Sequence, residues 1–213
     1  MILKKASYKA IKYACLKFHY AKSVPCNVFG YSVFNEKKEW CGCIVYGSGA
    51  NNNAGKSYGL RQGQIIELVR MSLNGKQEST SKALAISLRL IKKDLPLCEL
   101  IVSYADIDQD HKGIIYQATN WCFTGFSMLN KKDGSYIING VREHGKTIFD
   151  KLKRVGLNKT KQNILKYLDS NAVEYVTKGK IKYLYPLNNK MKEYCKSIQK
   201  PYSEINKQQA HEV

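Results

Sequence analysis

Short strand-like runs alternate with helix-like segments along the first 140 residues, and no other feature constrains the fold as strongly. Val, Ile, Tyr and Phe are frequent in the strand-like runs, which lie at residues 27–34, 39–47, 64–73, 98–106, 122–129 and 135–140. Apolar residues recur at helical spacing in the other segments, which lie at residues 7–20, 78–94 and 113–121. This order predicts an α/β (α+β) fold in which helices pack on both faces of a mixed sheet.

The character of the chain changes at Val141. Residues 141–213 contain 16 Lys and Arg against 7 Asp and Glu. Within this part, 146–170 is typical of two short basic helices separated by Gly156-Leu157-Asn158, and 180–187 is typical of a late strand. We expect the tail from Gln199 to fray. The predicted organisation is a core at 1–140, a basic helical insertion at 141–179, and a closing strand with the C-terminal tail at 180–213.

The charge of the whole chain points to a polyanionic partner. With 35 Lys and Arg against 17 Asp and Glu, the net charge is +18, far above what solubility requires. Fifteen tyrosines favour nucleic acid over an anionic membrane, because aromatic rings stack on bases while cations neutralise phosphates. The alternative is a proteome in which lysine covers every surface.

The cysteines indicate a reducing compartment. The chain has seven, an odd number, and most lie in apolar runs, as reduced core residues do. Cys41-Gly-Cys43 has no second pair at zinc-like spacing, so a buried strand is the better interpretation. The N-terminal segment has neither a continuous apolar stretch nor a cleavage site, and we expect a cytoplasmic protein.

One short motif suggests a nucleotide-hydrolysing enzyme. Residues 50–57, ANNNAGKS, fit a generous form of the phosphate-binding P-loop, and the strand ending at Asp106 imitates the acidic strand of such enzymes. A P-loop needs a helix directly after its Lys and Ser. Two glycines and then a strand follow Ser57 instead, so we interpret 50–57 as a surface loop.

Two other segments carry candidate chemistry. Arg70 ends a strand and is followed by a glycine turn and the hydroxyl-rich helix start Ser79-Thr80-Ser81, which together would hold a diphosphate; ordinary helix capping is the alternative. Asp106 ends the next strand, at the edge where sites of open sheets lie, and Tyr116 follows in a short helix.

These segments resemble a known family. The arrangement resembles the Gcn5-related N-acetyltransferase fold, and more closely the phage Mom-type DNA-modification proteins. The shared residues are His19-Tyr20 after the first helix, Glu67-Leu68-x-Arg70, and a long motif that runs from Tyr104-Ala105-Asp106 through H-x-G-x-I-Y-Q-A-x-N-W to Gly125. The long motif is specific, whereas the two short ones alone are weak. The usual acetyltransferase loop departs from its pattern here, because 73–80 contains one glycine only.

The resemblance implies an acetyl-CoA-dependent enzyme that converts the exocyclic amine of adenine in double-stranded DNA to a methylcarbamoyl derivative, which protects the DNA from restriction. It further implies iron. By position, His19, Tyr20, Asp106 and Tyr116 would form the metal or catalytic cluster, and imidazole, carboxylate and phenol ligands suit iron better than zinc. Arg70 and Ser79, Thr80 and Ser81 would hold CoA. His111 is interpreted as a turn residue.

The basic insertion provides the expected DNA contacts, at Lys151, Lys153, Arg154, Lys159 and Lys161. An extruded adenine would stack on Tyr20, Trp121 or Phe123, unless these belong to the core. Two alternatives stay open: an ordinary N-acetyltransferase acting on a small amine or a protein, and a DNA-binding protein without catalysis.

Overall fold

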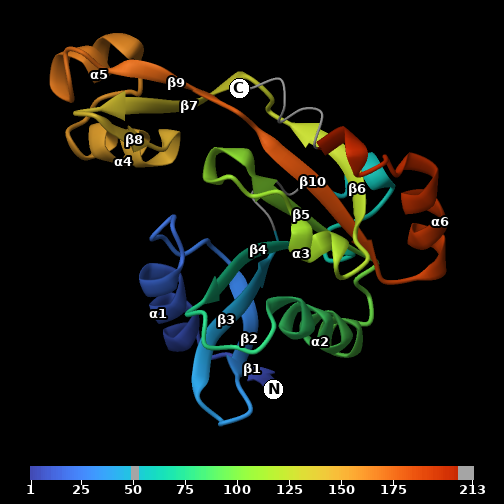
Figure 1. Cartoon of the computed structure of the whole chain (residues 1–213). Helices are drawn as coiled ribbons and strands as arrows, with labels where there is room; N and C mark the ends of the chain where they lie inside the picture. The colour runs from blue at the N-terminus through green and yellow to red at the C-terminus, as the bar shows by residue number, and fades with distance from the viewer. Residues whose placement is uncertain (49–52, 206–213) are drawn as a thin grey trace. The chain divides into compact units, whose positions relative to one another are not determined.

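The computed structural model describes residues 1–48 and 53–205, which form two compact units (Figure 1). Unit 1 comprises Met1–Ala105, His111–Gly125 and Ile181–Val213. Unit 2 comprises Asp106–Asp110 and Phe126–Lys180. Each unit has its own cluster of buried apolar side chains, as expected of a part that packs independently.

Unit 1 is built on a seven-stranded mixed sheet. The strand order is β1-β2-β3-β4-β5-β10-β6, in which the first four strands pair antiparallel and β4 pairs parallel with β5. The strands are β1 (Ile2–Lys5), β2 (Val28–Phe34), β3 (Trp40–Gly47), β4 (Ile65–Leu73), β5 (Leu100–Asp106), β6 (Cys122–Ser127) and β10 (Lys180–Pro186). The helices are α1 (Tyr8–Phe18), α2 (Thr80–Asp94), α3 (Ile114–Gln117) and α6 (Asn189–Ile198).

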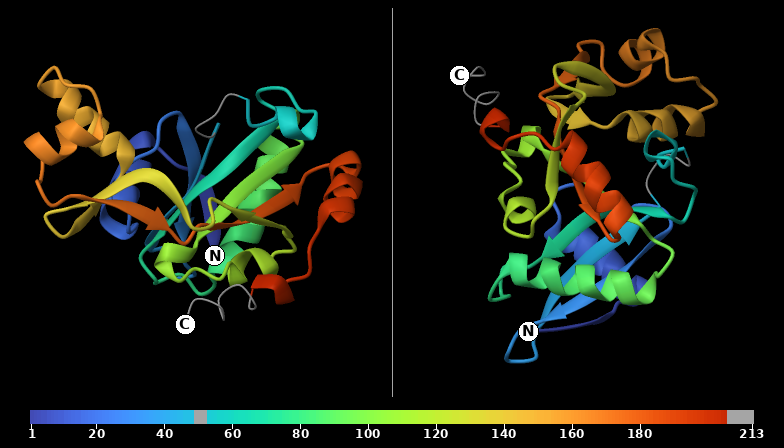
Figure 2. Two further views of the ribbon diagram at one scale, coloured as in Figure 1. Left: turned by 90° about the horizontal axis from the view of Figure 1, so that it is seen from above. Right: turned by 90° about the vertical axis from the view of Figure 1, so that its right-hand side faces the viewer.

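Two helices cover opposite faces of this sheet (Figure 2). Cys43 and Val45 of β3 pack in one cluster with buried residues of α1. Tyr46, the next residue along β3, instead bonds Ser87 of α2, with 2.7 Å between the hydroxyl oxygens. Successive side chains of a strand point to opposite faces, so α1 and α2 lie on different sides. The predicted mixed α/β fold with helices on both faces is confirmed.

The parallel strands β4 and β5 part halfway along their length. Their paired stretch runs from Ile65 opposite Leu100 to Leu68 opposite Ser103, although β4 continues to Leu73 and β5 to Asp106. A β-bulge lies at the same level, because Val45 opposes Arg70 while Tyr46 opposes Leu68 and Val69 is the extra residue. Backbone groups of both strands therefore become available for a ligand beyond this point.

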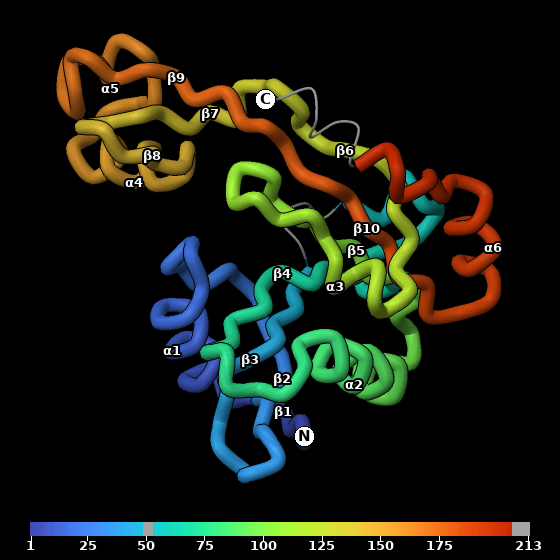
Figure 3. Tube along the Cα trace, in the orientation of Figure 1, coloured from blue at the N-terminus to red at the C-terminus, as the bar shows by residue number. Residues whose placement is uncertain are grey.

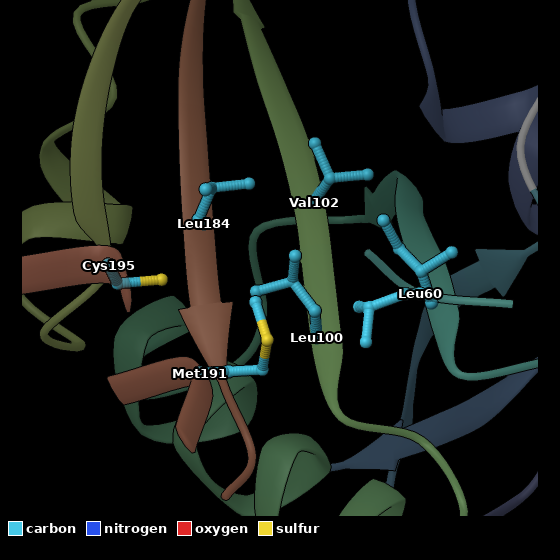
Figure 4. Packing of buried hydrophobic residues seen from close by; sticks show 7 residues of the cluster. Leu60, Leu100, Val102, Leu184, Met191 and Cys195 are labelled. Atoms are coloured by element: carbon cyan, nitrogen blue, oxygen red, sulfur yellow. The ribbon is translucent and has the colours of Figure 1, made fainter. Parts of the chain in front are cut away.

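The core of unit 1 continues beyond the predicted closing strand. Leu100 and Val102 of β5 lie beside Leu184 of β10 and Met191 of α6 (Figure 4). Helix α6 and strand β1 were not predicted, and the tail prediction is wrong as far as residue 205, because Ile205 is buried and the Tyr202 hydroxyl donates to the carbonyl of Trp121. The remainder of the predicted frayed tail, 206–213, lies outside the described residues.

Unit 2 is a three-stranded antiparallel sheet, in the order β8-β7-β9, with two helices (Figure 3). The elements are β7 (Lys131–Ile138), β8 (Val141–Glu143), α4 (Gly145–Arg154), α5 (Lys161–Tyr167) and β9 (Val173–Thr177). Ile148 and Leu152 of α4 and Ile164 of α5 pack against Tyr136 and Ile138 of β7. The two short helices are confirmed, whereas β8 and β9 were not predicted. The runs predicted as a strand pair lie in different sheets, as β6 and β7.

The P-loop motif lacks the context of a nucleotide-binding loop. Lys56 and Ser57 begin a 3₁₀ turn of three residues, Lys56–Tyr58, which Gly59 ends in a left-handed conformation. A P-loop helix of several turns does not follow them. Residues 50–52 of the motif lie outside the described residues. Among the described helices, none has the length and apolar character needed to cross a membrane.

Candidate active site

The point where β4 and β5 part is marked by a chain of hydroxyl groups. The Tyr116 Oη of α3 lies 2.9 Å from the Ser103 Oγ of β5. Ser103 donates to the carbonyl of Leu68 at 2.9 Å, and because it has a single proton, Tyr116 must donate to Ser103. The last paired residues of the two strands are thereby linked to the phenol that the sequence singled out.

Burial holds Tyr116 in its protonated form. The residue is 6% exposed, its ring stacks on that of Tyr183 with centroids 4.7 Å apart, and it meets Trp121 edge-on at 5.2 Å. Desolvation raises the pKa of Tyr116 to about 12, although the Ser103 hydrogen bond opposes the shift. The negative charge of Glu67 adds to the rise. At neutral pH the phenol is therefore a proton donor.

Glycine at position 113 allows α3 to begin where it does. Gly113 precedes Ile114 with φ +70°, in the left-handed region. A Cβ at this position would lie 2.3 Å from the Tyr183 hydroxyl and 2.5 Å from its ring, while that hydroxyl donates to the carbonyl of Lys112. Only glycine accommodates both the conformation and the close approach. The H-x-G part of the motif thus has a structural reason.

Glu67 is a site residue that the sequence reasoning left unassigned, although it begins the E-L-x-R motif. It is the third residue of β4, opposite Val102 of β5. Its charge contributes to the raised pKa of both Tyr116 and Tyr104. A strand-borne carboxylate is a group suited to accept a proton.

A second group of polar side chains gathers where α1 ends. His19 caps the helix, and its Nδ1 accepts from the backbone N–H of Ala21 at 3.1 Å. The pKa of His19 is lowered to about 4, mainly by burial and also by electrostatic interactions with Arg70, His111 and Lys22. His19 is neutral at pH 7, and since Nδ1 is an acceptor, its proton is on Nε2.

Tyr20 extends this group to the surface. Its ring centroid lies 4.3 Å from that of His19 and 5.7 Å from that of His111, which it meets edge-on. Tyr20 is 47% exposed, whereas Trp121 and Phe123 are 1% and 0% exposed. Of the three rings considered for stacking on an extruded base, Trp121 and Phe123 are core residues, and Tyr20 has the accessible ring.

Arg70 faces the same group. It lies opposite Val45 of β3 on the face that α1 covers. Its Nη1 donates to the carbonyl of Val69 at 2.7 Å, while its buried Nε has no hydrogen-bond partner in the described part of the chain. The charge of Arg70 contributes to the lowered pKa of His19.

The hydroxyls expected to hold CoA with Arg70 have capping partners. Ser79 caps α2 by accepting from the N–H of Lys82 at 3.1 Å, and its Oγ lies 3.1 Å from that of Ser81. Thr80 accepts from the Gln77 side chain at 2.9 Å. Within the described residues no hydrogen bond joins Arg70 to these three. Their role in CoA binding stays a prediction.

The four residues assigned to iron fall into both units. His19, Tyr20 and Tyr116 belong to unit 1, and Asp106 belongs to unit 2, where its Oδ1 accepts from the N–H of Asp108 at 3.1 Å. Asp106 therefore caps the short 3₁₀ turn that follows β5.

The residues of unit 1 do not fit a metal centre as they stand. In the described part of the chain, no group of three or more His, Cys, Asp and Glu side chains is arranged so that it could hold a metal ion. Binding a cation at His19 Nε2 would require its proton to move to Nδ1, which would then face the N–H of Ala21. The positive charges of Arg70 and Lys22 oppose a metal further. No step proposed below passes through iron.

The five basic residues expected to bind DNA differ in their surroundings. Lys151 is paired with Glu143, and the Lys159 ammonium donates to the carbonyl of Gly134 at 2.7 Å. Lys151, Lys153, Arg154 and Lys161 are exposed, and Lys159 is half-buried. Lys151 and Lys159 have polar partners within unit 2, and the other three are exposed without an ion pair to the described residues.

Comparison with solved structures finds acetyltransferases at low similarity. A mutant spermidine N-acetyltransferase from Vibrio cholerae aligns with TM-score 0.48 and 10% identity, over 91% of this chain and 99% of that one. The Vibrio cholerae spermidine N-acetyltransferase in complex with CoA and spermine gives 0.44 and 5%, over 86% and 92%. Gcn5 of Tetrahymena gives 0.40 and 10%, over 87% and 98%. At these scores the likenesses bear no weight in the assignment of activity.

Sequence comparison is decisive at the level of the family. Among curated proteins, no relative with significant sequence similarity was found. The model of the Mom protein family matches residues 1–204, which include every site residue discussed above. The chain therefore belongs to the Mom protein family.

Proposed function

We propose that this protein is an acetyl-CoA-dependent enzyme that converts the exocyclic amine of adenine in DNA to a methylcarbamoyl derivative and so protects the DNA from restriction. The observation that carries the proposal is Tyr116, a buried and protonated phenol bonded to Ser103 where β4 and β5 part, in a chain of the Mom protein family. In this proposal the thioester of acetyl-CoA lies between the parted strands.

Tyr116 acts on the departing thiolate by donating a hydrogen bond, for which its single proton turns from Ser103 to the sulfur when the thioester is bound. An ordinary thiol has a pKa of about 8.5, so complete transfer of a proton from a phenol at about 12 would cost about 5 kcal/mol. Donation without transfer stabilises the negative charge that develops on sulfur and avoids that cost. Glu67 is the carboxylate we assign to accept a proton from the amine. These two roles account for transfer of the acyl group to the amine, and the additional NH of the methylcarbamoyl group must come from a separate nitrogen donor.

The CoA diphosphate is assigned to Arg70 and the start of α2. The first N–H groups of a helix and a nearby guanidinium both favour an anion. Asp106, which belongs to unit 2, retains the catalytic role that the family resemblance implies.

DNA is the proposed substrate because the charge favours a polyanionic partner. The net charge is +18, and residues 126–180 of unit 2 contain 12 Lys and Arg against 5 Asp and Glu. Lysine and arginine contacts to phosphates give affinity that is largely independent of sequence. An adenine amine inside a duplex is inaccessible, so the base must be extruded, and Tyr20 offers the exposed ring on which it would stack.

The test is mass spectrometry of nucleosides from DNA of cells that express the protein. The wild type should yield a deoxyadenosine heavier by a methylcarbamoyl group, which contains one NH more than an acetyl group. Tyr116→Phe should reduce this product about a hundredfold or more. Tyr46→Phe is the matched control, because it also removes a buried phenol hydroxyl bonded to a serine, on the α2 face of the sheet.

Each other outcome contradicts part of the proposal. An N6-acetyl deoxyadenosine would indicate ordinary acyl transfer to the same base. Unmodified DNA together with an acetylated small amine would indicate an ordinary N-acetyltransferase. DNA binding without any binding of acetyl-CoA in calorimetry would indicate a non-catalytic protein.

A further inference from the structure

We propose that His19, Tyr20, Arg70 and His111 form a nucleotide site in unit 1, in which Arg70, His111 and the His19 Nε2–H bind a phosphate and Tyr20 stacks on the adjoining base. The proposal rests on the function above, which it deepens by assigning the site of the target nucleotide. It gives His111, first interpreted as a turn residue, a binding role.

Basic side chains from three segments of the chain lie around the end of α1. Lys22 follows the helix and its ammonium donates to the carbonyl of Lys17 at 2.9 Å, and Arg70 of β4 lies on the face of the sheet that α1 covers. His111, which precedes α3, meets the ring of Tyr20 edge-on. The permanent positive charges of Arg70 and Lys22 favour an anion at this place.

The same group has hydrogen-bond donors that the fold does not use. The Arg70 Nε is buried without a partner in the described part of the chain, and only the Nη1 of its guanidinium bonds the backbone. An unsatisfied buried donor costs free energy unless a ligand or water completes it. The proton of His19 is on Nε2, because the Ala21 N–H occupies Nδ1. Both residues therefore donate, as a phosphate requires.

Tyr20 adds a contact suited to a base. Nearly half of its surface is exposed, and its ring lies next to both histidines, at 4.3 Å from His19 and 5.7 Å from His111. An aromatic ring next to a phosphate-binding group is the combination by which proteins hold unpaired nucleotides, since stacking contributes about 1–3 kcal/mol per base.

The phosphate has two sources in the proposed reaction, the DNA backbone and CoA. We assign it to DNA because the exposed ring is at the same place, and an extruded adenine needs both contacts. Since Arg70 is also the residue expected to hold the CoA diphosphate, the two sources must be measured separately.

The experiment uses the full chain and two ligands, a short duplex with one unpaired adenine and acetyl-CoA. His111→Gln and Arg70→Gln should each weaken binding of the duplex about tenfold or more, which is the loss expected for a hydrogen bond to a charged group. His144→Gln is the matched control, because His144 also accepts a backbone N–H at Nδ1, from Lys146, but belongs to unit 2. In NMR titrations the duplex should raise the pKa of His19 from about 4.

Unchanged affinities of both variants for both ligands, with an unmoved His19 pKa, would overturn the site. A loss confined to acetyl-CoA would overturn the assignment to the target nucleotide and give the phosphate to CoA. The inference and the proposed function fail separately. If the wild type modifies deoxyadenosine but His111→Gln does not weaken duplex binding, the inference alone is wrong. If His111→Gln weakens duplex binding but the wild type leaves the DNA unmodified, the proposed function alone is wrong.

Discussion

The hydroxyl of Tyr116 lies 2.9 Å from that of Ser103, and through this bond α3 is joined to the strands that part beneath it. The core contains a second copy of the arrangement. Tyr46 bonds Ser87 at 2.7 Å, and Ser87 donates to the carbonyl of Leu84, just as Ser103 donates to that of Leu68. The pair allows catalytic and structural effects to be separated.

Ser103→Ala should reduce both stability and activity. The substitution leaves the buried Tyr116 hydroxyl and the Leu68 carbonyl without their partner, at a cost of about 1–3 kcal/mol. Ser87→Ala should cost about the same in urea unfolding and leave the yield of modified deoxyadenosine unchanged. Equal activity of the two variants would show that the Ser103 bond has a structural role only.

The pKa of His19 makes stability depend on pH in a defined window. The value is lowered from 6.5 to about 4, so between these two values the unfolded chain binds more protons than the folded one. The contribution of His19 is therefore fully present above about pH 6.5, is lost as the pH falls toward 4, and changes no further below that.

The measurement compares wild type and His19→Gln by urea unfolding at pH 7.5, 5.5 and 4.5. The wild type should lose more stability than the variant on acidification. Parallel losses would contradict the lowered pKa, and NMR titration of the imidazole would report it directly. His144→Gln controls for the removal of a capping histidine.

Periodicity predicted the elements that have one regular face. α1 and α2 were found because their buried residues, such as Ile11 and Leu84, recur at helical spacing. β1 was not predicted, because its four residues, ILKK, are too few to show an alternating pattern. The pairing of β6 with β10 joins residues far apart in the chain, and no local signal in Cys122–Ser127 indicates that partner. Such pairing is a property of the whole sheet.

The sequence predicted the candidate-site residues that a motif marks. It did not predict the residue whose role depends on a contact between distant segments. Tyr116 was assigned to the site from the long motif, and it does bond Ser103 at the point where β4 and β5 part. His111 stands in the same motif, but its proximity to His19 depends on the end of α1 meeting the turn before α3, about ninety residues away in sequence. Sequence spacing contains no information on that contact.

Gly113→Ala should destabilise unit 1 and reduce activity. A left-handed conformation costs a non-glycine residue about 1 kcal/mol or more, and the new Cβ would overlap the ring of Tyr183. We expect a loss of about 2 kcal/mol or more in urea unfolding. Gly59→Ala, which has a similar φ of +65° and open space at its Cβ, should show the conformational cost alone. Equal losses would contradict the overlap with Tyr183.

Asp108→Asn should loosen unit 2. The carboxylate, whose side chain is 3% exposed, accepts from the Arg142 guanidinium at 2.7 Å, from Thr177 at 2.6 Å, and from Tyr175 and the N–H of Lys178 at 2.9 Å. Removing one partner of a buried ion pair costs about 3–5 kcal/mol. Hydrogen exchange of residues 131–177 should accelerate.

Asp150→Asn is the control for this change. Its carboxylate forms an exposed pair with Lys146 on α4, and such pairs contribute little to stability. Hydrogen exchange in unit 2 should be close to that of the wild type. If Asp108→Asn left exchange equally unchanged, the carboxylate could not be the centre that holds 106–110 to β9.

The salt dependence of DNA binding should depend on the exposed cations of unit 2. Lys153, Arg154 and Lys161 are exposed, and each phosphate contact contributes about 0.9 to the slope of log K against log salt, so replacing all three with Gln should reduce the slope by about 2 to 3. Lys159→Gln should instead destabilise unit 2, because its ammonium bonds the Gly134 carbonyl.

The control for the triple variant replaces three exposed lysines of unit 1, Lys37, Lys92 and Lys93, and removes the same charge. Fluorescence anisotropy with a duplex at several salt concentrations gives the slopes. Equal reductions in both triple variants would show that overall charge, and not the surface of unit 2, binds the DNA backbone.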